Sequence, residues 1–416
     1  MITTLRQRNF ALLWFGGLIS SIGDWILNIG LPIYVFLLTH SILATSIMLF
    51  AGYLPSVLFG SIAGVLVDRW NHRNTMIITS LLLMLALLPL LVVRTEGLIW
   101  IVYVVAFIEA SISQFFMPAQ NALLPMLVIE EHLVYANALN SFSGNAARLI
   151  GPALGGIIAA LFGLSGIVLA DVFSFLISGA LIFCISISPI QDRLRFDRET
   201  LLPVTKLGVV SRALSEWIDG LHVIRSERTL IVLLGAFALI GLGEGAMGTL
   251  FPIFVYQVLH GTALQIGELM SAQAVGGIAG GLLVGWIGKR VTTGWVIGLC
   301  TVIFGLIDLA IFNTPTFFPV FWLSFGLFVL VGIPGIIGQT GMFSLMQAKA
   351  PDNYRGRVFG ALNTTLGLLI LIGTLITGAV TEHLGVVTIL NLQGTGYIAA
   401  GLLMTILLPR EQKLGA

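Results

Sequence analysis

The chain reads Gly64-Val65-Leu66-Val67-Asp68-Arg69-Trp70-Asn71-His72-Arg73 between two long apolar runs. A related stretch lies in the corresponding place 217 residues later: Gly281-Leu282-Leu283-Val284-Gly285-Trp286-Ile287-Gly288-Lys289-Arg290. The glycines one helical turn upstream, Gly60 and Gly277, also correspond. The chain therefore repeats itself, and the sequence predicts two related halves.

The composition indicates that most of the surface faces lipid. The mean hydropathy is +1.03, and 57% of the residues are hydrophobic while 9% are charged, against about 25% charged in soluble domains. Helices or closed barrels alone satisfy their backbone polar groups in lipid. The apolar runs are apolar on every face for about 20 residues, which is the length of a membrane-spanning helix. We predict twelve spans, near residues 10–38, 44–67, 74–93, 98–125, 138–162, 165–189, 229–257, 262–287, 293–313, 317–346, 358–381 and 386–408.

The Lys and Arg residues gather on one side of these spans. Of the 20, 18 lie at one side, whereas Arg94 falls in an opposite loop and Arg148 lies inside a span. Because Lys and Arg accumulate in cytoplasmic loops, that side is predicted to be the cytoplasm. An even number of spans then places both termini in the cytoplasm.

The longest polar segment divides the chain into three parts. We expect an N-terminal six-helix bundle over residues 1–190, a cytoplasmic central loop over 191–228, and a C-terminal six-helix bundle over 229–416. Each half has six spans, so the halves run parallel and not inverted. The later part of the loop is amphipathic at helical spacing, which predicts a helix lying on the inner membrane surface. Its apolar residues are Val210, Leu214, Trp217, Ile218, Leu221 and Ile224.

The segment 64–73 resembles the signature that the major facilitator superfamily carries between its second and third spans. The residues that fit are Gly64, Asp68, Arg69 and Arg73, and Asn71 stands where the signature has a glycine. The resemblance implies an all-α membrane protein with twelve transmembrane helices in two pseudo-symmetric six-helix bundles. It also implies alternating access to a substrate site near the membrane midplane.

A second match lies in span five, where Gly151-Pro152-Ala153-Leu154-Gly155-Gly156 resembles the motif of drug–proton antiporters. With Pro118, Pro125 and the run Arg355-Gly356-Arg357, the chain is similar to the branch that holds macrolide-efflux proteins and the enterobactin exporter. The resemblance therefore implies export from a bacterial cell across the plasma (inner) membrane. One departure is that such antiporters usually carry an Arg in span four, where this chain has no basic residue.

Ionisable residues inside the bilayer are costly and are therefore functional candidates. At about 1.5 Å of rise per residue, four of them fall near the middle of spans one, four, five and seven: Asp24, Glu109, Arg148 and Glu244. Four others fall near outer span ends, where we expect a solvated or capping role: Asp171, Glu268, Asp308 and Glu382.

By the resemblance, spans one, four, seven and ten line the central cavity, which places the three mid-depth acids on cavity helices. Asp24 and Glu244 are repeat mates, so they are expected to face one another and to repel when both are ionised. A proton or a cationic substrate would relieve that repulsion. Glu109 and Arg148 form the expected ion pair, and a purely structural role remains the alternative for each. Further proton-coupling or substrate candidates are Asn28, Phe116, Gln120 and Gln339.

Two segments are candidates for moving parts. Asp68 is expected to act as a cytoplasmic latch at the start of span eleven, where a helix N-terminus attracts an anion and Arg357 adds a cation. Gly64, Arg69 and Arg73 belong to the same latch. The small residues of span five allow close approach to a neighbouring helix, as a gating element or as plain packing: Gly151, Pro152, Gly155 and Gly156.

The sequence carries no enzyme signature, no metal-binding motif and no nucleotide-binding loop, so we expect no catalytic activity and no cofactor. An ion gradient is then the expected energy source. The predicted function is a secondary transporter that exports a small amphipathic compound, drug-like or siderophore-like, by proton antiport. Alternatives are a lipid or lysophospholipid flippase of the same fold and a non-transporting membrane sensor. The expected partners are a small-molecule substrate, protons and the lipid bilayer, with no nucleic acid, and the protein is expected to be a monomer.

Overall fold

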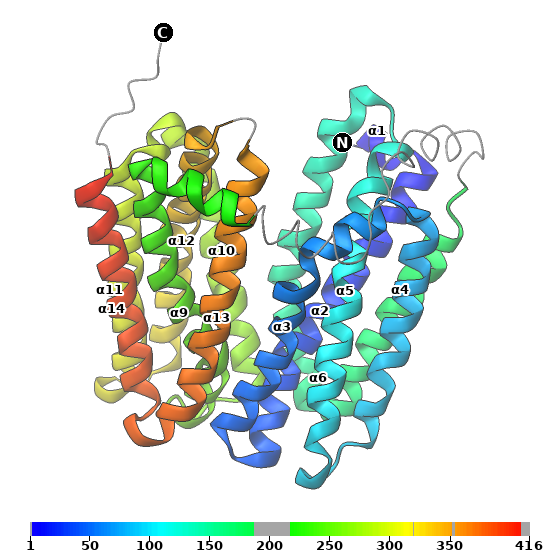
Figure 1. Ribbon diagram of the computed structural model, residues 1–416. Coiled ribbons are helices and arrows are strands. Elements are labelled where there is room, and N and C mark those ends of the chain that lie inside the picture. Colours follow the sequence, from blue (N-terminus) through cyan, green and yellow to red (C-terminus); the bar gives the residue numbers. More distant parts are fainter. Residues whose placement is uncertain (1, 187–216, 319, 352–353, 409–416) are drawn as a thin grey trace. The chain divides into compact units, whose positions relative to one another are not determined.

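The structure is a computed structural model, and it describes residues 2–186, 217–318, 320–351 and 354–408. Every regular element in these ranges is helical (Figure 1). The first half contains α1 (Ile2–Leu5), α2 (Arg8–Thr39), α3 (Ile42–Val67), α4 (His72–Leu87), η1 (Leu88–Val92), η2 (Glu96–Leu98), α5 (Ile99–Leu127), η3 (Glu130–His132) and α6 (Leu133–Phe183). The second half contains α9 (Arg228–Gln257), α10 (Ala263–Ile287), η4 (Gly288–Thr292), α11 (Gly294–Phe317), α12 (Phe321–Lys349), α13 (Arg355–Leu384) and α14 (Val386–Leu407).

Eleven helical segments of the described ranges are long and apolar enough to cross a membrane. One of them, α6, has 51 residues, which at ~1.5 Å per residue is more than twice the ~30 Å hydrocarbon core. Gly163 interrupts α6 with a φ of 59°, a backbone conformation that glycine adopts without strain. The two parts of α6 on either side of Gly163 are therefore the predicted spans five and six, and the all-α fold with twelve crossings is confirmed.

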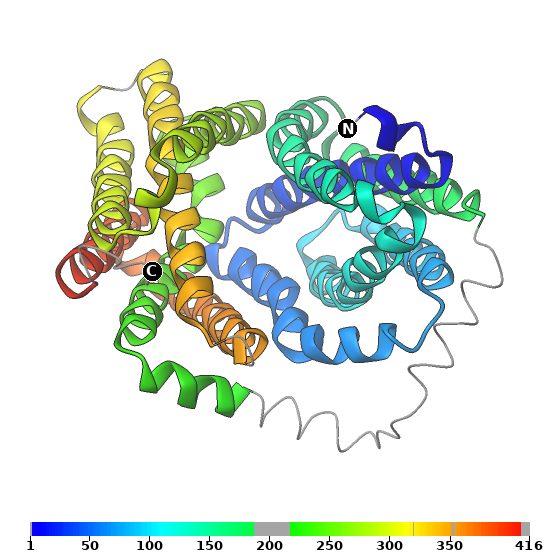
Figure 2. The same ribbon diagram turned by 90° about the horizontal axis from the view of Figure 1, so that it is seen from above.

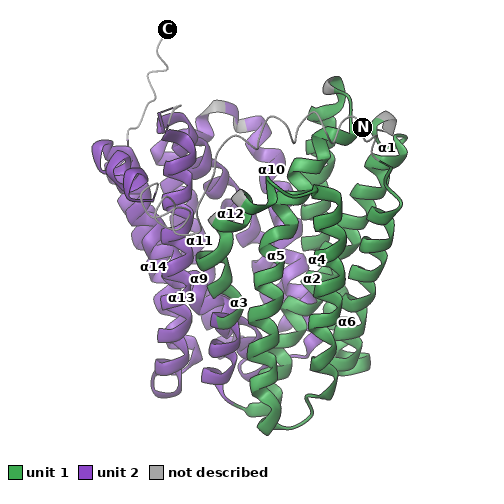
Figure 3. Cartoon of the chain, turned by 45° about the vertical axis from the view of Figure 1, so that its right-hand side comes forward, with its two compact units in different colours: residues 1–40, 51–211 green, residues 41–50, 212–416 purple. Residues whose placement is uncertain are grey.

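The described helices form two compact units, and each is described by itself (Figure 3). Unit 1 comprises residues 1–40 and 51–211, and unit 2 comprises residues 41–50 and 212–416. The first residues of α3 thus group with the C-terminal half. There Ser46 Oγ lies directly beside Gly378 of α13, so that a Cβ on this glycine would overlap the hydroxyl.

In unit 1, α2 packs along both parts of α6, and α4 packs against α5 and α6 (Figure 2). Small residues bring α6 close to α2. A Cβ on Gly151 would overlap Trp25 Cβ, and a Cβ on Gly155 would lie 3.2 Å from Ile26 Cα. Such close approach favours helix association in lipid, where apolar burial alone gives no preference for a helix over a lipid chain.

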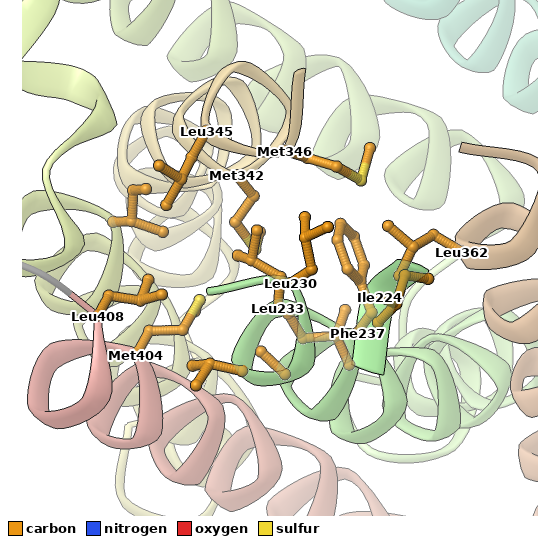
Figure 4. Close-up of a cluster of buried hydrophobic side chains, with 14 of the residues drawn as sticks. Ile224, Leu230, Leu233, Phe237, Met342, Leu345, Met346, Leu362, Met404 and Leu408 are labelled. Atoms are coloured by element: carbon orange, nitrogen blue, oxygen red, sulfur yellow. The ribbon is translucent and has the colours of Figure 1, made fainter. Parts of the chain in front are cut away.

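In unit 2, α9 packs against α13 and α14, α10 packs against α12, and α11 packs against α12 and α14. Glycines again lie at the crossings. A Cβ on Gly245 of α9 would lie 2.6 Å from the backbone nitrogen of Thr374, and a Cβ on Gly401 of α14 would lie 2.6 Å from that of Val302. One end of this bundle is closed by an apolar cluster that includes Leu230, Phe237, Leu345, Leu362 and Met404 (Figure 4).

The amphipathic segment is helical over residues 217–226, and part of its apolar face packs on protein. Ile224 is fully buried in the apolar cluster of unit 2, and Trp217 and Leu221 pack against that cluster (Figure 4). Gly220 permits this, because a Cβ there would overlap the Arg357 carbonyl oxygen of α13. Ile218 stays exposed. The location of this helix on the inner membrane surface stays a prediction, and Val210 and Leu214 lie outside the described residues.

The close helix crossings lead to a stability prediction on α10. A Cβ on Gly276 would overlap the Val329 carbonyl oxygen of α12, whereas a Cβ on Gly281 of the same helix would meet nothing within 4 Å. We expect Gly276→Val to destabilise the protein by about 1–3 kcal/mol, as overpacking does, and Gly281→Val to have a much smaller effect. The measurement is the thermal unfolding midpoint of both purified variants in one detergent. Equal midpoints would show that this crossing does not limit stability.

Candidate functional site

The acids of unit 1 gather around α2. Asp24 on α2 and Glu109 on α5 are half-buried, and the Glu109 carboxylate accepts a hydrogen bond of 3.1 Å from Ser113 Oγ. Asp171, on the second part of α6, is 0% exposed. Asp24 and Glu109 both act electrostatically on Asp171. Three carboxyl groups from three helices therefore influence one another inside unit 1.

The solvated role expected for Asp171 is wrong. Its side chain lies at the α2–α6 contact, where Ser174 Oγ donates to Asp171 Oδ1 over 2.9 Å. Gly23 makes the room for it, because a Cβ on Gly23 would overlap both Asp171 Oδ1 and Ser174 Oγ. Counting residues along a span gives the depth of a side chain but not the face on which it lies. Asp171 lies on the face that α2 covers.

The expected ion pair between Glu109 and Arg148 is also wrong. Arg148 is exposed, and Glu109 accepts from Ser113 on its own helix. Asn28 is exposed, and its side-chain amide donates to the backbone oxygen of Asp24, one turn earlier in α2, over 2.8 Å. The amide therefore binds the backbone of Asp24 and not its carboxylate.

Phe116 and Gln120 lie in the interior of unit 1. Phe116 belongs to an apolar cluster with Phe10 and Leu13. Gln120 is buried, donates to Asn140 Oδ1 over 3.4 Å, and lies against Gly17 of α2. Both side chains therefore contribute to packing of α5 in this structure.

Unit 2 contains a second polar group of residues. Glu244 on α9 is exposed and accepts a hydrogen bond from the Tyr397 hydroxyl of α14. Asp308 on α11 is 3% exposed, so the solvated role expected for it is wrong as well. Its Oδ2 accepts a hydrogen bond of 3.2 Å from Gln393 Nε2. Gln393 in turn lies on Gly243, where a Cβ would come within 2.8 Å of Gln393 Cγ.

The other two acids expected near outer span ends are less enclosed. Glu268 on α10 is half-buried, and Glu382 near the end of α13 is exposed. The exposure of Glu382 agrees with the solvated role predicted for it.

The two units share one arrangement at this level. Gly23 and Asp24 correspond to Gly243 and Glu244 in the repeat. In each unit the glycine lies under a polar side chain of the last helix, which is Asp171 in unit 1 and Gln393 in unit 2. An acid in one unit thus stands where the other unit has an amide.

A cavity of about 520 Å³ opens on unit 2. It is lined by Gln339, Thr340, Phe343, Ser344 and Gln347 of α12 and by Phe359 of α13. The rings of Phe343 and Phe359 are nearly parallel, with centroids 6.4 Å apart. Gln339, a candidate from the sequence, is exposed into this cavity. Amides, hydroxyls and aromatic faces line it, without a charged residue.

The repeated loop is ordered by local contacts within unit 1. Asn71 caps α4, with its Oδ1 accepting from the Asn74 backbone nitrogen over 2.9 Å. Arg73 Nε donates to the Ile182 carbonyl oxygen over 3.3 Å, and its guanidinium lies 5.6 Å from the Phe183 ring centroid. A cation at a helix C-terminus is favoured by the helix dipole, so Arg73 holds the end of α6.

Asp68 and Arg357 belong to different units, and the latch role of the loop stays a prediction. Asp68 is exposed, and Gly64 has open space around its Cα. Within unit 2, Arg357 Nη1 lies 3.2 Å from Asp219 Oδ2. Both side chains of that ion pair are about half exposed, so its contribution to stability is small.

Sequence reasoning did not find Tyr397 or Gln393, and it misplaced Asp171 and Asp308. The repeat gave a signal for Asp171 and Gln393. The offset of 220 residues that relates Gly23 to Gly243 also relates Asp171 to a position two residues before Gln393. Tyr397 and Asp308 had no such signal, since their partners lie on helices far away in sequence.

The sequence matches the family described as "Transmembrane secretion effector" over residues 1–414. It is 27% identical to macrolide efflux protein A of Streptococcus pyogenes over 405 residues, which cover 93% of this chain and 92% of the relative. The staphyloferrin A transporter of Staphylococcus aureus is 23% identical, with 91% and 90% covered. The enterobactin exporter EntS of Citrobacter koseri is 22% identical, with 96% and 91% covered.

Among solved structures, an inward-facing bacterial homologue of the iron transporter ferroportin aligns with a TM-score of 0.70. The sequence identity is 18%, and the alignment covers 96% of this chain and 98% of that one, so this likeness shows the fold. The family and the relatives are transporters and not enzymes. The chain is a multi-pass membrane protein that belongs to the transmembrane secretion effector family of major facilitator transporters.

Proposed function

We propose that this protein is a secondary active exporter that expels a small amphipathic compound, drug-like or siderophore-like, in exchange for protons. The observation that carries the proposal is the matched pair of acids at one repeat position. Asp24 and Glu244 each follow a closely packed glycine near the middle of the first helix of their unit. Each is accompanied by a second acid of its own unit, Asp171 or Asp308.

Protons are the species best suited to neutralise these acids. A carboxylate within the bilayer is costly unless it is paired. Within the described residues, no Lys, Arg or His forms an ion pair with any of the five acids Asp24, Glu109, Asp171, Glu244 and Asp308. Uptake of a proton, or binding of a cationic substrate, lowers that cost. Each ligand then binds best to the form that the other has left, and this competition is the physical basis of antiport.

The cavity of unit 2 supports an amphipathic substrate. Phe343 and Phe359 offer flat apolar faces, while Gln339 and Gln347 offer amide donors and acceptors. Its lining is uncharged, so it suits the neutral part of a substrate. The relatives are named for macrolide efflux and for siderophore transport, and both classes are candidates for export by this chain. A flippase or a sensor of the same fold would not require Asp24 and Glu244 to exchange protons.

The orientation follows from the charge distribution. We propose that the protein works as a monomer in the bacterial inner membrane. Both termini are then in the cytoplasm, because Lys and Arg accumulate on cytoplasmic loops. A screen of macrolides, cationic dyes and siderophores for accumulation in cells, with and without a protonophore, identifies the substrate. Accumulation that does not respond to the protonophore would contradict proton coupling.

The coupling role predicts a specific loss in two variants. Asp24→Asn and Glu244→Gln mimic the protonated carboxyl, so we expect each to retain substrate exchange between equal concentrations but to lose export driven by a pH gradient. The measurement is uptake into proteoliposomes with and without an imposed gradient. Glu382→Gln is the matched control, because Glu382 is exposed near the end of α13. Gradient-driven transport at the wild-type rate in both variants would leave Glu109 as the leading candidate.

The cavity role predicts an effect on substrate affinity. Phe343→Ala removes one of two parallel rings and Gln339→Leu removes an amide, so we expect each to raise the substrate concentration at half-maximal transport. The maximal rate should change less, because neither residue is proposed to carry protons. Phe317→Ala, at an exposed position of α11, provides the control. Unchanged half-saturation in both cavity variants would remove the cavity from the substrate path.

A further inference from the structure

Asp171 is the most buried acid among the described residues of unit 1, and one of its two carboxyl oxygens has no hydrogen-bond partner there. Oδ1 accepts from Ser174 Oγ over 2.9 Å. Oδ2 is buried and has no hydrogen-bond partner among the described residues. A buried carboxylate oxygen without a partner is strongly disfavoured, and protonation of the carboxyl group lowers that cost.

A second orphaned group lies on the same face of α6. Ser178 follows Ser174 by one helical turn, is fully buried, and its Oγ also has no hydrogen-bond partner. It lies against Gly16 of α2, as Ser174 lies against Gly23. The contact between α2 and α6 therefore includes two buried polar atoms, Asp171 Oδ2 and Ser178 Oγ, that have no partner among the described residues.

The charged groups around Asp171 are acids. Asp24 from α2 and Glu109 from α5 act on it. The other helix packed on this part of α6 is α4, whose charged or titratable residues, His72 and Arg73, lie in its first turn, where Arg73 binds the last carbonyls of α6. Within the described residues no group of acids, histidines and cysteines has the arrangement to hold a metal ion. A proton remains as the cation that fits.

Unit 2 has a neutral side chain with a hydrogen-bond donor, Gln393, at the position that corresponds to Asp171. Gln393 stands where unit 1 has Asp171, and its amide donates to the Asp308 carboxylate over 3.2 Å. A protonated aspartic acid resembles an amide, since each has one donor side and one acceptor side. Gln393 thus holds permanently the hydrogen-bonding pattern that Asp171 would have when protonated.

We propose that Asp171 is a second proton-carrying residue, which with Asp24 forms a carboxyl pair that holds one proton inside unit 1. This inference deepens the proposed proton antiport and rests on it for its role in transport. Two neighbouring carboxyl groups in a low-dielectric site do not both ionise, and they titrate as a pair. In the exchange the proton leaves a carboxyl oxygen of one residue and is bound by a carboxylate oxygen of the other, so the pair keeps one proton and one negative charge. A second proton, or a cationic substrate, then neutralises the remaining charge.

The test detects the proton itself and needs no substrate. Full-length protein, with its aspartate side chains labelled with carbon-13, is reconstituted in phospholipid vesicles, and infrared difference spectra are recorded between acidic and alkaline pH. We expect the wild type to show an isotope-shifted band of protonated aspartic acid at neutral pH that Asp171→Asn lacks. Asp24→Asn should shift that band, since its partner has changed. Glu382→Gln should leave the band unchanged.

A second variant covers the case in which Asp171→Asn does not fold. Ser174→Ala removes the donor to Oδ1 and keeps the carboxyl, so we expect the band to shift in frequency without being lost. An aspartic acid band that is unchanged in Asp171→Asn, or in Ser174→Ala where Asp171→Asn does not fold, would overturn the proposal.

Transport measurements separate this inference from the proposed function. If wild-type vesicles show no pH-driven transport of any compound in the screen, proton antiport fails, whereas loss of the band in Asp171→Asn would still establish the proton site. If the wild type is pH-driven and Asp171→Asn retains both the band and the pH dependence of transport, the inference on Asp171 fails while antiport stands.

Discussion

Close backbone contact at glycines is the constraint on which the rest of this structure depends. Lipid chains are as apolar as leucine, so helices in a bilayer associate through tight packing and polar contacts. In unit 1, Gly151 and Gly155 seat the first part of α6 on α2, and Gly23 seats the second part. In unit 2, Gly243 and Gly245 do the same for α14 and α13. Glycines also make room between helices for Asp171, Gln120 and Gln393.

The fold was largely predictable because its determinants are one-dimensional. Apolar length predicts the number of crossings, and Gly163 separates two of them by interrupting α6. The side-chain environment was less predictable, because depth along a span does not determine which face another helix covers. Asp171 and Asp308 have sequence positions near span ends, yet α2 and α14 enclose them. The predicted ion pair of Arg148 with Glu109 was wrong for the same reason, because the two residues lie at a similar depth but the Arg148 side chain is exposed.

The two units are similar in backbone and different in charge. In unit 1, hydroxyl groups are the hydrogen-bond partners of Glu109 and Asp171. In unit 2, Glu244 and Asp308 each accept from a neutral donor of α14, Tyr397 for Glu244 and Gln393 for Asp308. Tyr397 also packs against Phe304 within the apolar cluster of unit 2. Its hydroxyl therefore joins the acid on α9 to this apolar cluster, whereas Glu109 and Asp171 of unit 1 accept from serines of their own helices.

The contact at Gly23 also restricts how this lineage evolves. A Cβ at position 23 overlaps both Asp171 Oδ1 and Ser174 Oγ, so a side chain there requires both of these residues to move or to become smaller. A smaller residue at 171 or 174, with Gly23 kept, loosens the contact between α2 and α6. We therefore expect positions 23, 171 and 174, which lie up to 151 residues apart in the chain, to change together and not independently.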